Sequence, residues 1–172
     1  MTIQNILVLI KPDGIQRGLI GEIIKRFEQR GIKIVAMKMI SVDKKFASKH
    51  YKQSIADKHG EHVRNYLLDY LTATPVVAMI LEGSNIIIHV RKIVGNTYPG
   101  EADIGTIRGD FAHASKAYAK SAKKALSNLI HASENEENAK EEIALWFSKD
   151  EIHNYKLSHE GNWDRINQSQ SK

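Results

Sequence analysis

The sequence places one histidine where it could act as a nucleophile. His131 follows the short apolar run Leu129-Ile130, which is typical of a strand, and polar side chains stand nearby at Asn128 and Ser133. Glu142 comes eleven residues later in a stretch with helical spacing, so a return from strand to helix would bring its carboxylate to the imidazole. A carboxylate on one ring nitrogen fixes the tautomer and leaves the other nitrogen free to attack. The pattern is compatible with covalent catalysis, although a lone histidine is more often structural.

A second group of side chains is suited to binding phosphate. Arginine offers a two-pronged fork of donors and lysine a compact positive charge, and both suit phosphoryl oxygens when rigid elements hold them. Such residues lie at the ends of expected elements or in an expected loop: Lys11, Arg91, Thr97 and Arg108. Each of them alone is better explained as a solvated surface residue.

Common nucleotide and metal motifs are absent from the sequence. It contains no G-x-x-x-x-G-K-[ST] phosphate loop, no G-x-G-x-x-G after a strand, no H-E-x-x-H and no EF-hand loop. His59 and His62 are three residues apart and could flank a metal, but no third ligand is near them. His50 has no obvious partner. We therefore predict no metal site made by protein side chains.

Length and composition are those of one ordinary globular domain. The chain has 172 residues, of which 42% are hydrophobic and 26% charged, with a formal net charge of +5. At roughly 150 residues per domain this predicts a single domain over residues 1–172, large enough for a core without cross-links. The lack of cysteine excludes disulfides, thiol catalysis and Cys-ligated metal clusters. We expect a cytoplasmic protein without membrane contact, since no apolar run suits a signal peptide or a membrane span.

Hydrophobic periodicity predicts four strands, at Asn5–Ile10, Ile32–Ile40, Val76–Leu81 and Asn128–His131. Helical spacing recurs in six segments: 19–27, 43–51, 62–71, 85–94, 112–127 and 136–147. The second strand is apolar on both faces, which favours a central place in the sheet. Residues 52–62 look irregular, and a long loop is expected over 95–111, where a structureless stretch is usually functional. This order predicts an α/β sandwich on a small sheet, with parallel and antiparallel pairing both open.

Five blocks in collinear order make the sequence recognisable. It resembles the nucleoside diphosphate kinases in the segments 11–24, 75–79, 105–111, 128–133 and 142–147, which read KPDGIQRGLIGEII, PVVAM, GTIRGDF, NLIHAS and EIALWF. The match runs from about residue 5 to residue 155. Several blocks in the right order are far more specific than any single motif.

The resemblance implies a ferredoxin-like βαββαβ fold, which is an α/β sandwich with a four-stranded antiparallel sheet covered by helices. It implies transfer of the γ-phosphate of a nucleoside triphosphate to a nucleoside diphosphate, with Mg²⁺ bound on the nucleotide phosphates. It also implies a ping-pong mechanism through phospho-His131 that is indifferent to the base. Phosphoryl transfer mainly needs alignment and charge compensation, which a cluster of this kind supplies.

The same resemblance implies a role for each candidate residue. His131 would be the nucleophile, Glu142 its orienting partner, and Ser133 a hydrogen-bond donor to that carboxylate. The remaining residues would surround the nucleotide: Lys11, Arg91 and Arg108 on the transferring and bridging oxygens, Thr97 near the β-phosphate, Tyr51 beside the histidine, Asn128 with Lys11 on the ribose 3′-OH, and Leu67 near the base.

Two insertions, at about residues 52–62 and 112–127, depart from the usual pattern of the family. The usual segment whose phenylalanine stacks on the base is absent. Counting back from Pro75 puts Val63 and Leu67 at the positions of the family's aromatic residue and its leucine. Either Tyr66 substitutes for the aromatic residue or base stacking is weak. A C-terminal tail over 158–172 completes the expected single domain.

The second insertion carries a basic stripe of Lys116, Lys120, Lys123 and Lys124 at helical spacing. Its simplest interpretation is a solvated helix face. Three sharper interpretations stay open: an anionic partner such as nucleic acid, added positive potential at the nucleotide mouth, or contact with a neighbouring subunit. The resemblance implies a homo-oligomer, with a hexamer favoured over a tetramer.

Two alternative functions also stay open. The chain could be a catalytically weak family member that acts mainly as a nucleic-acid- or protein-binding module through the basic insertion. It could instead be a histidine phosphocarrier that passes its phosphate to a protein. The first would show salt-dependent retention on DNA, and the second would show a phosphoenzyme that no nucleoside diphosphate discharges.

Overall fold

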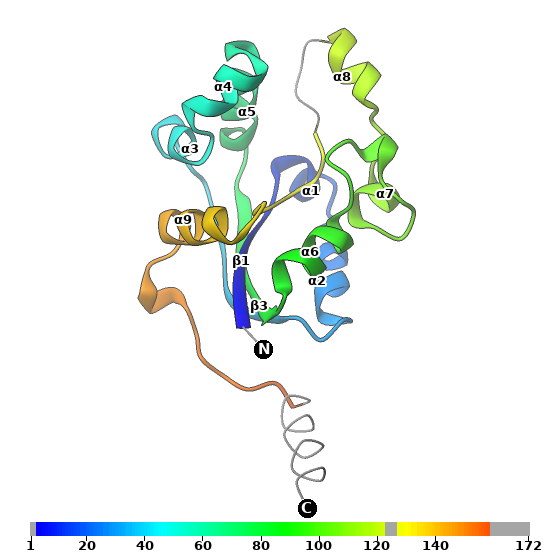
Figure 1. Ribbon diagram of the computed structural model, residues 1–172. Helices are drawn as coiled ribbons and strands as arrows, with labels where there is room; N and C mark the ends of the chain where they lie inside the picture. The colour runs from blue at the N-terminus through cyan, green and yellow to red at the C-terminus, as the bar shows by residue number, and fades with distance from the viewer. Residues whose placement is uncertain (1–2, 123–126, 159–172) are drawn as a thin grey trace, which may run out of the picture.

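Figure 1 shows the computed structural model of the chain, which describes residues 3–122 and 127–158. Its centre is a four-stranded antiparallel sheet in the order β2-β3-β1-β4. The strands are β1 (Ile3–Ile10), β2 (Lys33–Ile40), β3 (Val76–Ser84) and β4 (Ile130–Ala132). Helical segments connect β1 to β2 and β3 to β4. Together with the strand order, these connections define the predicted ferredoxin-like fold.

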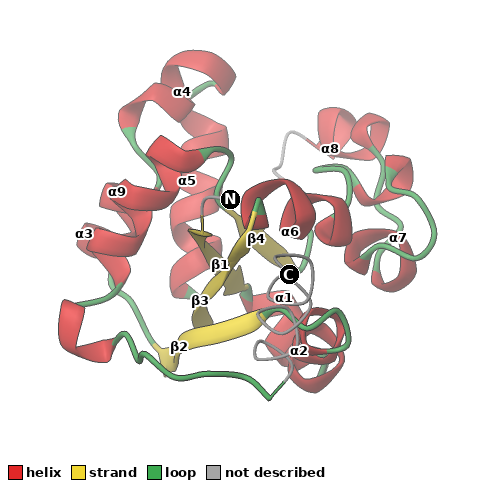
Figure 2. Cartoon of the chain, turned by 60° about the horizontal axis from the view of Figure 1, so that its bottom comes forward, coloured by secondary structure: helices red, strands yellow, loops and turns green. Residues whose placement is uncertain are grey.

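Helices cover both faces of the sheet because its central strands are apolar on both sides. On β1, Ile6, Val8 and Ile10 point into one core, Leu7 and Leu9 point into the other, and all five are fully buried. Figure 2 shows α2 and α6 on one side of the sheet and α3, α5 and α9 on the other. The helices of the first side are α1 (Pro12–Gln16), α2 (Ile20–Glu28), α6 (Ile86–Val94) and α7 (Ile107–Phe111), and those of the second are α3 (Lys44–His50), α5 (Glu61–Thr72) and α9 (Glu136–Trp146).

Strand β2 lies at an edge of the sheet, so the expectation of a central strand is wrong. In the described ranges its only strand partner is β3, and the side chains of Met37 and Met39 are 56% and 59% exposed. The pairing with β3 is irregular near Val35, whose carbonyl instead accepts a hydrogen bond from the backbone N–H of His153 (2.8 Å). The apolar outer residues of β2 therefore form exposed surface and are not buried between two strands.

Residues 52–62 are mostly helical, which corrects the expectation of an irregular stretch. They contain α4 (Gln53–His59). Gly60 follows this helix and directly precedes α5. Gly60 has a φ of +94°, a conformation that side chains other than glycine rarely allow. This residue lets the chain reverse sharply, so that α4 and α5 form a helical hairpin above the sheet (Figure 1).

The segment expected to be a long loop is also structured. It contains the short 3₁₀ helix η1 (Pro99–Glu101) and then α7, whose first turn is capped by the hydroxyl of Thr106 accepting from Gly109 N (3.1 Å). Helix α8 (Lys116–Ala122) is shorter than the predicted 112–127, and Lys123 and Lys124 lie outside the described residues. The tail beyond 158 lies outside them too, while the 3₁₀ helix η2 (Lys149–Glu151) precedes it.

The turn that leads into β4 has an unusual backbone. Leu129 has a φ of +68°, in the left-handed region that costs a non-glycine residue about 1–2 kcal/mol, and its side chain is fully buried. Two hydrogen bonds hold this residue: Lys11 N donates to Leu129 O (2.8 Å), and Leu129 N donates to Asp13 Oδ2 (3.0 Å). Asp13 also accepts from the hydroxyl of Tyr70 in α5. The segment after β1 thereby fixes the turn that presents His131.

Replacing Asp13 by alanine should destabilise the protein. The Asp13→Ala variant leaves the N–H of Leu129 without its acceptor, so we expect the free energy of unfolding in urea to fall by about 1–3 kcal/mol. Asp57→Ala, an exposed site on α4, is the matched control and should change stability by about 0.5 kcal/mol or less. Equal stability of the Asp13 variant and the wild type would show that this carboxylate does not hold the turn.

Candidate active site

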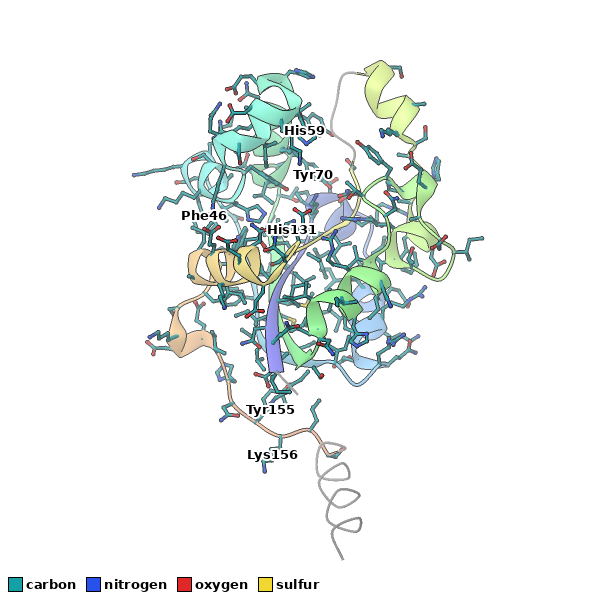
Figure 3. All side chains as sticks on the ribbon, in the orientation of Figure 1. Phe46, His59, Tyr70, His131, Tyr155 and Lys156 are labelled. Carbon is teal, nitrogen blue, oxygen red and sulfur yellow. The ribbon has the colours of Figure 1, made fainter. Side chains whose placement is uncertain are left out.

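One cavity of about 1010 Å³ brings the predicted site residues together. It lies between the α4–α5 hairpin, the segment that follows α6, and the ends of β1 and β4. Figure 3 shows His131 below His59 and Tyr70 of the hairpin in this view. Nine of the ten predicted residues line the cavity: Lys11, Tyr51, Leu67, Arg91, Thr97, Arg108, Asn128, His131 and Glu142. The tenth, Ser133, is fully buried behind Glu142.

The imidazole of His131 is held by one carboxylate oxygen. Its Nε2 lies 3.0 Å from Oε2 of Glu142, and the hydroxyl of Ser133 donates to the same oxygen at 2.6 Å. Ser133 is itself tied to β1, because its backbone N–H donates to Leu7 O (3.1 Å). An ionised carboxylate can only accept, so Nε2 carries the proton and Nδ1 is the ring nitrogen with a free lone pair.

The charge of Glu142 is stabilised within the site. Burial alone would raise the pKa of this carboxyl, but the charge of His131 and the hydrogen bonds from His131 and Ser133 outweigh it and lower the pKa to about 2. Glu142 is therefore ionised at neutral pH. A fixed negative charge on Nε2–H stabilises any positive charge that develops on the ring when Nδ1 forms a bond.

Lys11 and Asn128 form a preorganised pair at the floor of the cavity. The ammonium of Lys11 donates to Oδ1 of Asn128 (2.9 Å), and the amide of Asn128 donates to the backbone carbonyl of Thr97 (2.9 Å). Burial and the nearby charge of Arg108 lower the pKa of Lys11 to about 7. A buried cation without a carboxylate partner in its hydrogen-bond network is ready to receive an anion.

Arg108 of α7 links the end of α6 to the segment that leads into β4. Its Nε donates to Asn128 O (3.2 Å), and its two terminal nitrogens donate to Gly95 O (3.0 Å) and Ile130 O (2.7 Å). Burial and the charge of Arg91 lower the pKa of Arg108 to about 10, which still leaves the guanidinium charged. Three of its five N–H groups are used in this way, so two remain for a ligand. Arg91 is exposed and lines the same cavity from the end of α6.

Two neighbouring side chains at the end of α3 bury polar atoms without partners. The hydroxyl of Tyr51 and Nε2 of His50 are buried, and neither has a hydrogen-bond partner among residues 3–122 and 127–158. Burial raises the pKa of Tyr51 and keeps the phenol protonated. Buried polar groups usually have partners, so orphaned ones in a cavity wall point to a role in that cavity.

One group of side chains has the spacing of a metal site. Ring nitrogens of His50 and His131 and a carboxylate oxygen of Glu142 lie within 4.8 Å of one another. However, the indole N–H of Trp146 donates to Nδ1 of His50 (3.2 Å), so the proton of a neutral His50 sits on Nε2 and that nitrogen cannot ligate. The other two groups are already hydrogen-bonded to each other. The cluster therefore does not fit a resident metal ion.

Several residues of the site have no clear sequence signal. His50 was expected to lack a partner, yet it contacts both His131 and Trp146. Tyr98 and Lys116 line the cavity, with the ammonium of Lys116 5.3 Å from the centre of the Tyr98 ring. These contacts join positions distant in sequence, and neither periodicity nor spacing could reveal them.

The part of the cavity lined by α4 and α5 differs from the simplest expectation. Val63 and Leu67 line it, and His59 and His62 lie beside them on either side of Gly60. Tyr66 is not among the lining residues, since its ring stacks on Tyr70 at a centroid distance of 6.0 Å. Tyr66 therefore does not supply the missing aromatic residue in this conformation.

A histidine paired with a carboxylate, next to the buried side chains of Lys11 and Arg108, suits phosphoryl transfer. The sequence model of the family "nucleoside diphosphate kinase" matches residues 4–152. A nucleoside diphosphate kinase of Borreliella burgdorferi is 45% identical over 161 residues, covering 93% of this chain and 96% of that protein. The chain belongs to the nucleoside diphosphate kinase family, whose reaction moves the γ-phosphate of a nucleoside triphosphate to a nucleoside diphosphate.

Solved structures of relatives agree with this assignment. A nucleoside diphosphate kinase from Borrelia burgdorferi, described as a transition-state mimic with vanadate and ADP, superposes with a TM-score of 0.89 at 44% identity, covering 93% of this chain and 96% of that one. A halophilic relative from Halobacterium salinarum in complex with CDP gives a TM-score of 0.79 at 34% identity, covering 93% and 97%. Over the part of the chain that is described, none of the helices has the length and apolar character needed to span a membrane.

Nucleotide binding should draw a proton onto Lys11. With a pKa of about 7, this amine is mostly neutral at pH 8, and the negative charge of bound phosphates favours the ammonium and raises the pKa. Calorimetric titration with ADP at pH 8, in buffers of different ionisation enthalpy, should show uptake of about one proton beyond that of ADP itself. The Lys11→Met variant should lose this uptake. The same uptake in both proteins would mean that Lys11 is not the group that gains the proton.

Proposed function

We propose that this chain carries out the family reaction by a ping-pong mechanism through a phosphohistidine at His131. The observation that carries this proposal is the hydrogen bond between Nε2 of His131 and Glu142, which leaves Nδ1 as the nucleophilic nitrogen of a side chain that lines the cavity. One site then serves donor and acceptor in turn. The donor in the first step leaves as a diphosphate before the acceptor enters.

In the first half-reaction, the lone pair of Nδ1 attacks the γ-phosphorus of the triphosphate. The bond from that phosphorus to the β–γ bridging oxygen breaks, and the diphosphate leaves with this oxygen. In the second, a terminal β-phosphate oxygen of the incoming diphosphate attacks the phosphorus, and the bond to Nδ1 breaks. The proton on Nε2 of His131 stays hydrogen-bonded to Glu142 through both half-reactions, so His131 returns to its starting form.

The cations of the cavity would compensate the charge of the transferring group. Lys11, Arg91 and Arg108 are proposed to bind transferring and bridging oxygens, and Thr97, which lines the same cavity, is proposed to contact the β-phosphate. Such fixed donors act mainly by alignment and electrostatic stabilisation, which is what a loose phosphoryl-transfer state needs. The hydroxyl of Tyr51, buried without a partner, would donate near His131.

Asn128 and Lys11 are proposed to hold the ribose 3′-OH. They already form a hydrogen bond with each other at the floor of the cavity, so a hydroxyl could join both without rearrangement. Recognition of sugar and phosphate by these groups leaves base identity free. The solved relatives with ADP and with CDP support this indifference to the base.

We propose that Mg²⁺ enters with the nucleotide and has no ligand from the protein. The ion prefers oxygen ligands, and the carboxylate next to His131 is already committed to His131 and Ser133. The cations Lys11, Arg91 and Arg108 line the same cavity. When bound on the phosphates, the ion adds to their charge neutralisation.

The base would lie between two walls at the outer end of the cavity. Val63 and Leu67 form an apolar wall on α5. The second wall is formed by Tyr98, which precedes η1, and by Lys116 of the second insertion, whose ammonium lies near the Tyr98 ring. Among the interpretations of the basic stripe, this favours added positive potential at the nucleotide mouth, since its first lysine lines the cavity. The side chain of Lys120 and both Lys123 and Lys124 lie outside what the structure describes.

A homo-oligomer and a cytoplasmic location complete the proposal. The exposed methionines Met37 and Met39 on the edge strand β2 are apolar surface of the kind that a neighbouring subunit covers. A hexamer is favoured over a tetramer only by the family resemblance, as is a single domain with an insertion at 112–127. A second function in nucleic-acid binding has no described contact in its favour.

Removing the nucleophile should abolish turnover without unfolding the protein. We expect His131→Ala to lower kcat by at least about a thousandfold, while thermal unfolding and ADP affinity stay close to those of the wild type. His89→Ala, an exposed histidine on α6, is the control. Wild-type initial rates at varied donor and acceptor should give parallel double-reciprocal lines. Turnover by His131→Ala near the wild-type rate, or converging lines, would contradict the proposed mechanism.

A further inference from the structure

His50 occupies the centre of an aromatic cluster beside the nucleophile. It ends α3, is only 8% exposed, and contacts rings from three positions. The centroids of Tyr51, His131 and Trp146 lie 4.8, 4.7 and 5.5 Å from that of His50. Through these contacts α3 is joined to β4, which carries His131, and to α9, which carries Glu142. His50 therefore connects the elements that supply both partners of the catalytic pair.

The protonation state of His50 is fixed by its surroundings. An indole N–H can only donate, so the hydrogen bond from Trp146 to Nδ1 (3.2 Å) makes that nitrogen an acceptor and confines the proton to Nε2. Burial, together with the charges of His131 and Lys11, lowers the pKa of His50 to about 3, and Glu142 opposes this only in part. The ring therefore stays neutral in one tautomer throughout the physiological pH range.

The contact between His50 and His131 supplies a constraint that Glu142 alone does not. A single hydrogen bond to Nε2 fixes one point of the imidazole but allows the ring plane to turn about it. His50 packs against His131 at an interplanar angle of 83°, a perpendicular arrangement that aromatic rings favour. A ring packed in this way opposes rotation of His131 and so fixes the direction in which Nδ1 points.

We propose that His50 is a positioning residue for phosphoryl transfer, a ring locked by Trp146 that holds the imidazole of His131 in its attacking orientation. This rests on the proposed role of His131 as the nucleophile. His50 is proposed to act through His131, against whose ring it packs, and not by a bond to the transferring group. Its effect should therefore fall on the rate of transfer and not on nucleotide affinity, which depends on other residues.

Two substitutions separate the packing of the His50 ring on His131 from the hydrogen bond between His50 and Trp146. His50→Asn keeps an acceptor near the position of Nδ1 for Trp146 but removes the ring that packs on His131. His50→Phe keeps a ring but removes the acceptor for Trp146. His89→Asn, at an exposed position on α6, controls for the loss of a histidine as such.

Single-turnover formation of the phosphoenzyme from labelled ATP, measured per folded molecule, tests the proposal. Misplacement of a reacting group by about 1 Å can cost a hundredfold in rate, so we expect His50→Asn to be slower by about ten- to a hundredfold. His50→Phe should lie between His50→Asn and the wild type. The dissociation constant of ADP should change less than about threefold in every variant. Nitrogen-15 NMR of the imidazoles should show that His131 keeps its Nε2–H tautomer in His50→Asn, because Glu142 still accepts that proton, so a slower rate reports the direction of Nδ1 and not its protonation.

The outcomes separate this inference from the proposed function. Unchanged phosphorylation rates in His50→Asn and His50→Phe, with a normal wild-type phosphoenzyme, would overturn the role of His50 alone. A lower melting temperature with an unchanged rate would show that His50 is merely structural, and would also overturn it. Failure of the wild type itself to form a phosphoenzyme would instead overturn the proposed function.

Discussion

The hydrogen bond between His131 and the carboxylate of Glu142 is the interaction on which the rest of the site depends. It decides which ring nitrogen carries the proton and therefore which one is free to attack. The pair is partly buried, where a lone carboxylate would be unfavourable, and the imidazole and the Ser133 hydroxyl stabilise its charge. Since Ser133 is hydrogen-bonded to the backbone of β1, the pair is fixed to a central strand of the sheet.

In the cationic floor of the cavity, each basic residue makes more than one contact. Lys11 directly follows β1, and its backbone N–H holds the left-handed Leu129 while its ammonium holds Asn128. Arg108 ties three backbone carbonyls together around this point. Lowered pKa values at Lys11 and Arg108 show that their charges are poorly solvated before a ligand binds. Donors arranged in advance in this way need little reorganisation when charge moves in the reaction.

Local sequence patterns predicted the strands and most helices, the family resemblance implied the antiparallel ferredoxin-like fold, and several contacts of the site were beyond both. Strands and most helices followed from periodicity, and the collinear motifs named the residues that line the cavity. The edge position of β2 was missed because an apolar strand sequence does not show whether a second strand pairs with it or part of its surface stays exposed. Asp13 and His50 were missed because their partners, Leu129 and Trp146, are about 100 residues away in sequence. Only the folded chain shows such pairs.

The most direct test of this account is the position of phosphorus on the histidine. Enzyme labelled with nitrogen-15 in its histidines would be phosphorylated with ATP and Mg²⁺ in the absence of acceptor, and phosphorus–nitrogen coupling would identify the bonded nitrogen. The account predicts one phosphorus, bound to Nδ1 of His131, that GDP, CDP and UDP all remove. Phosphorus on Nε2 of His131, or on no histidine, would contradict the role given to Glu142 and the mechanism built on it.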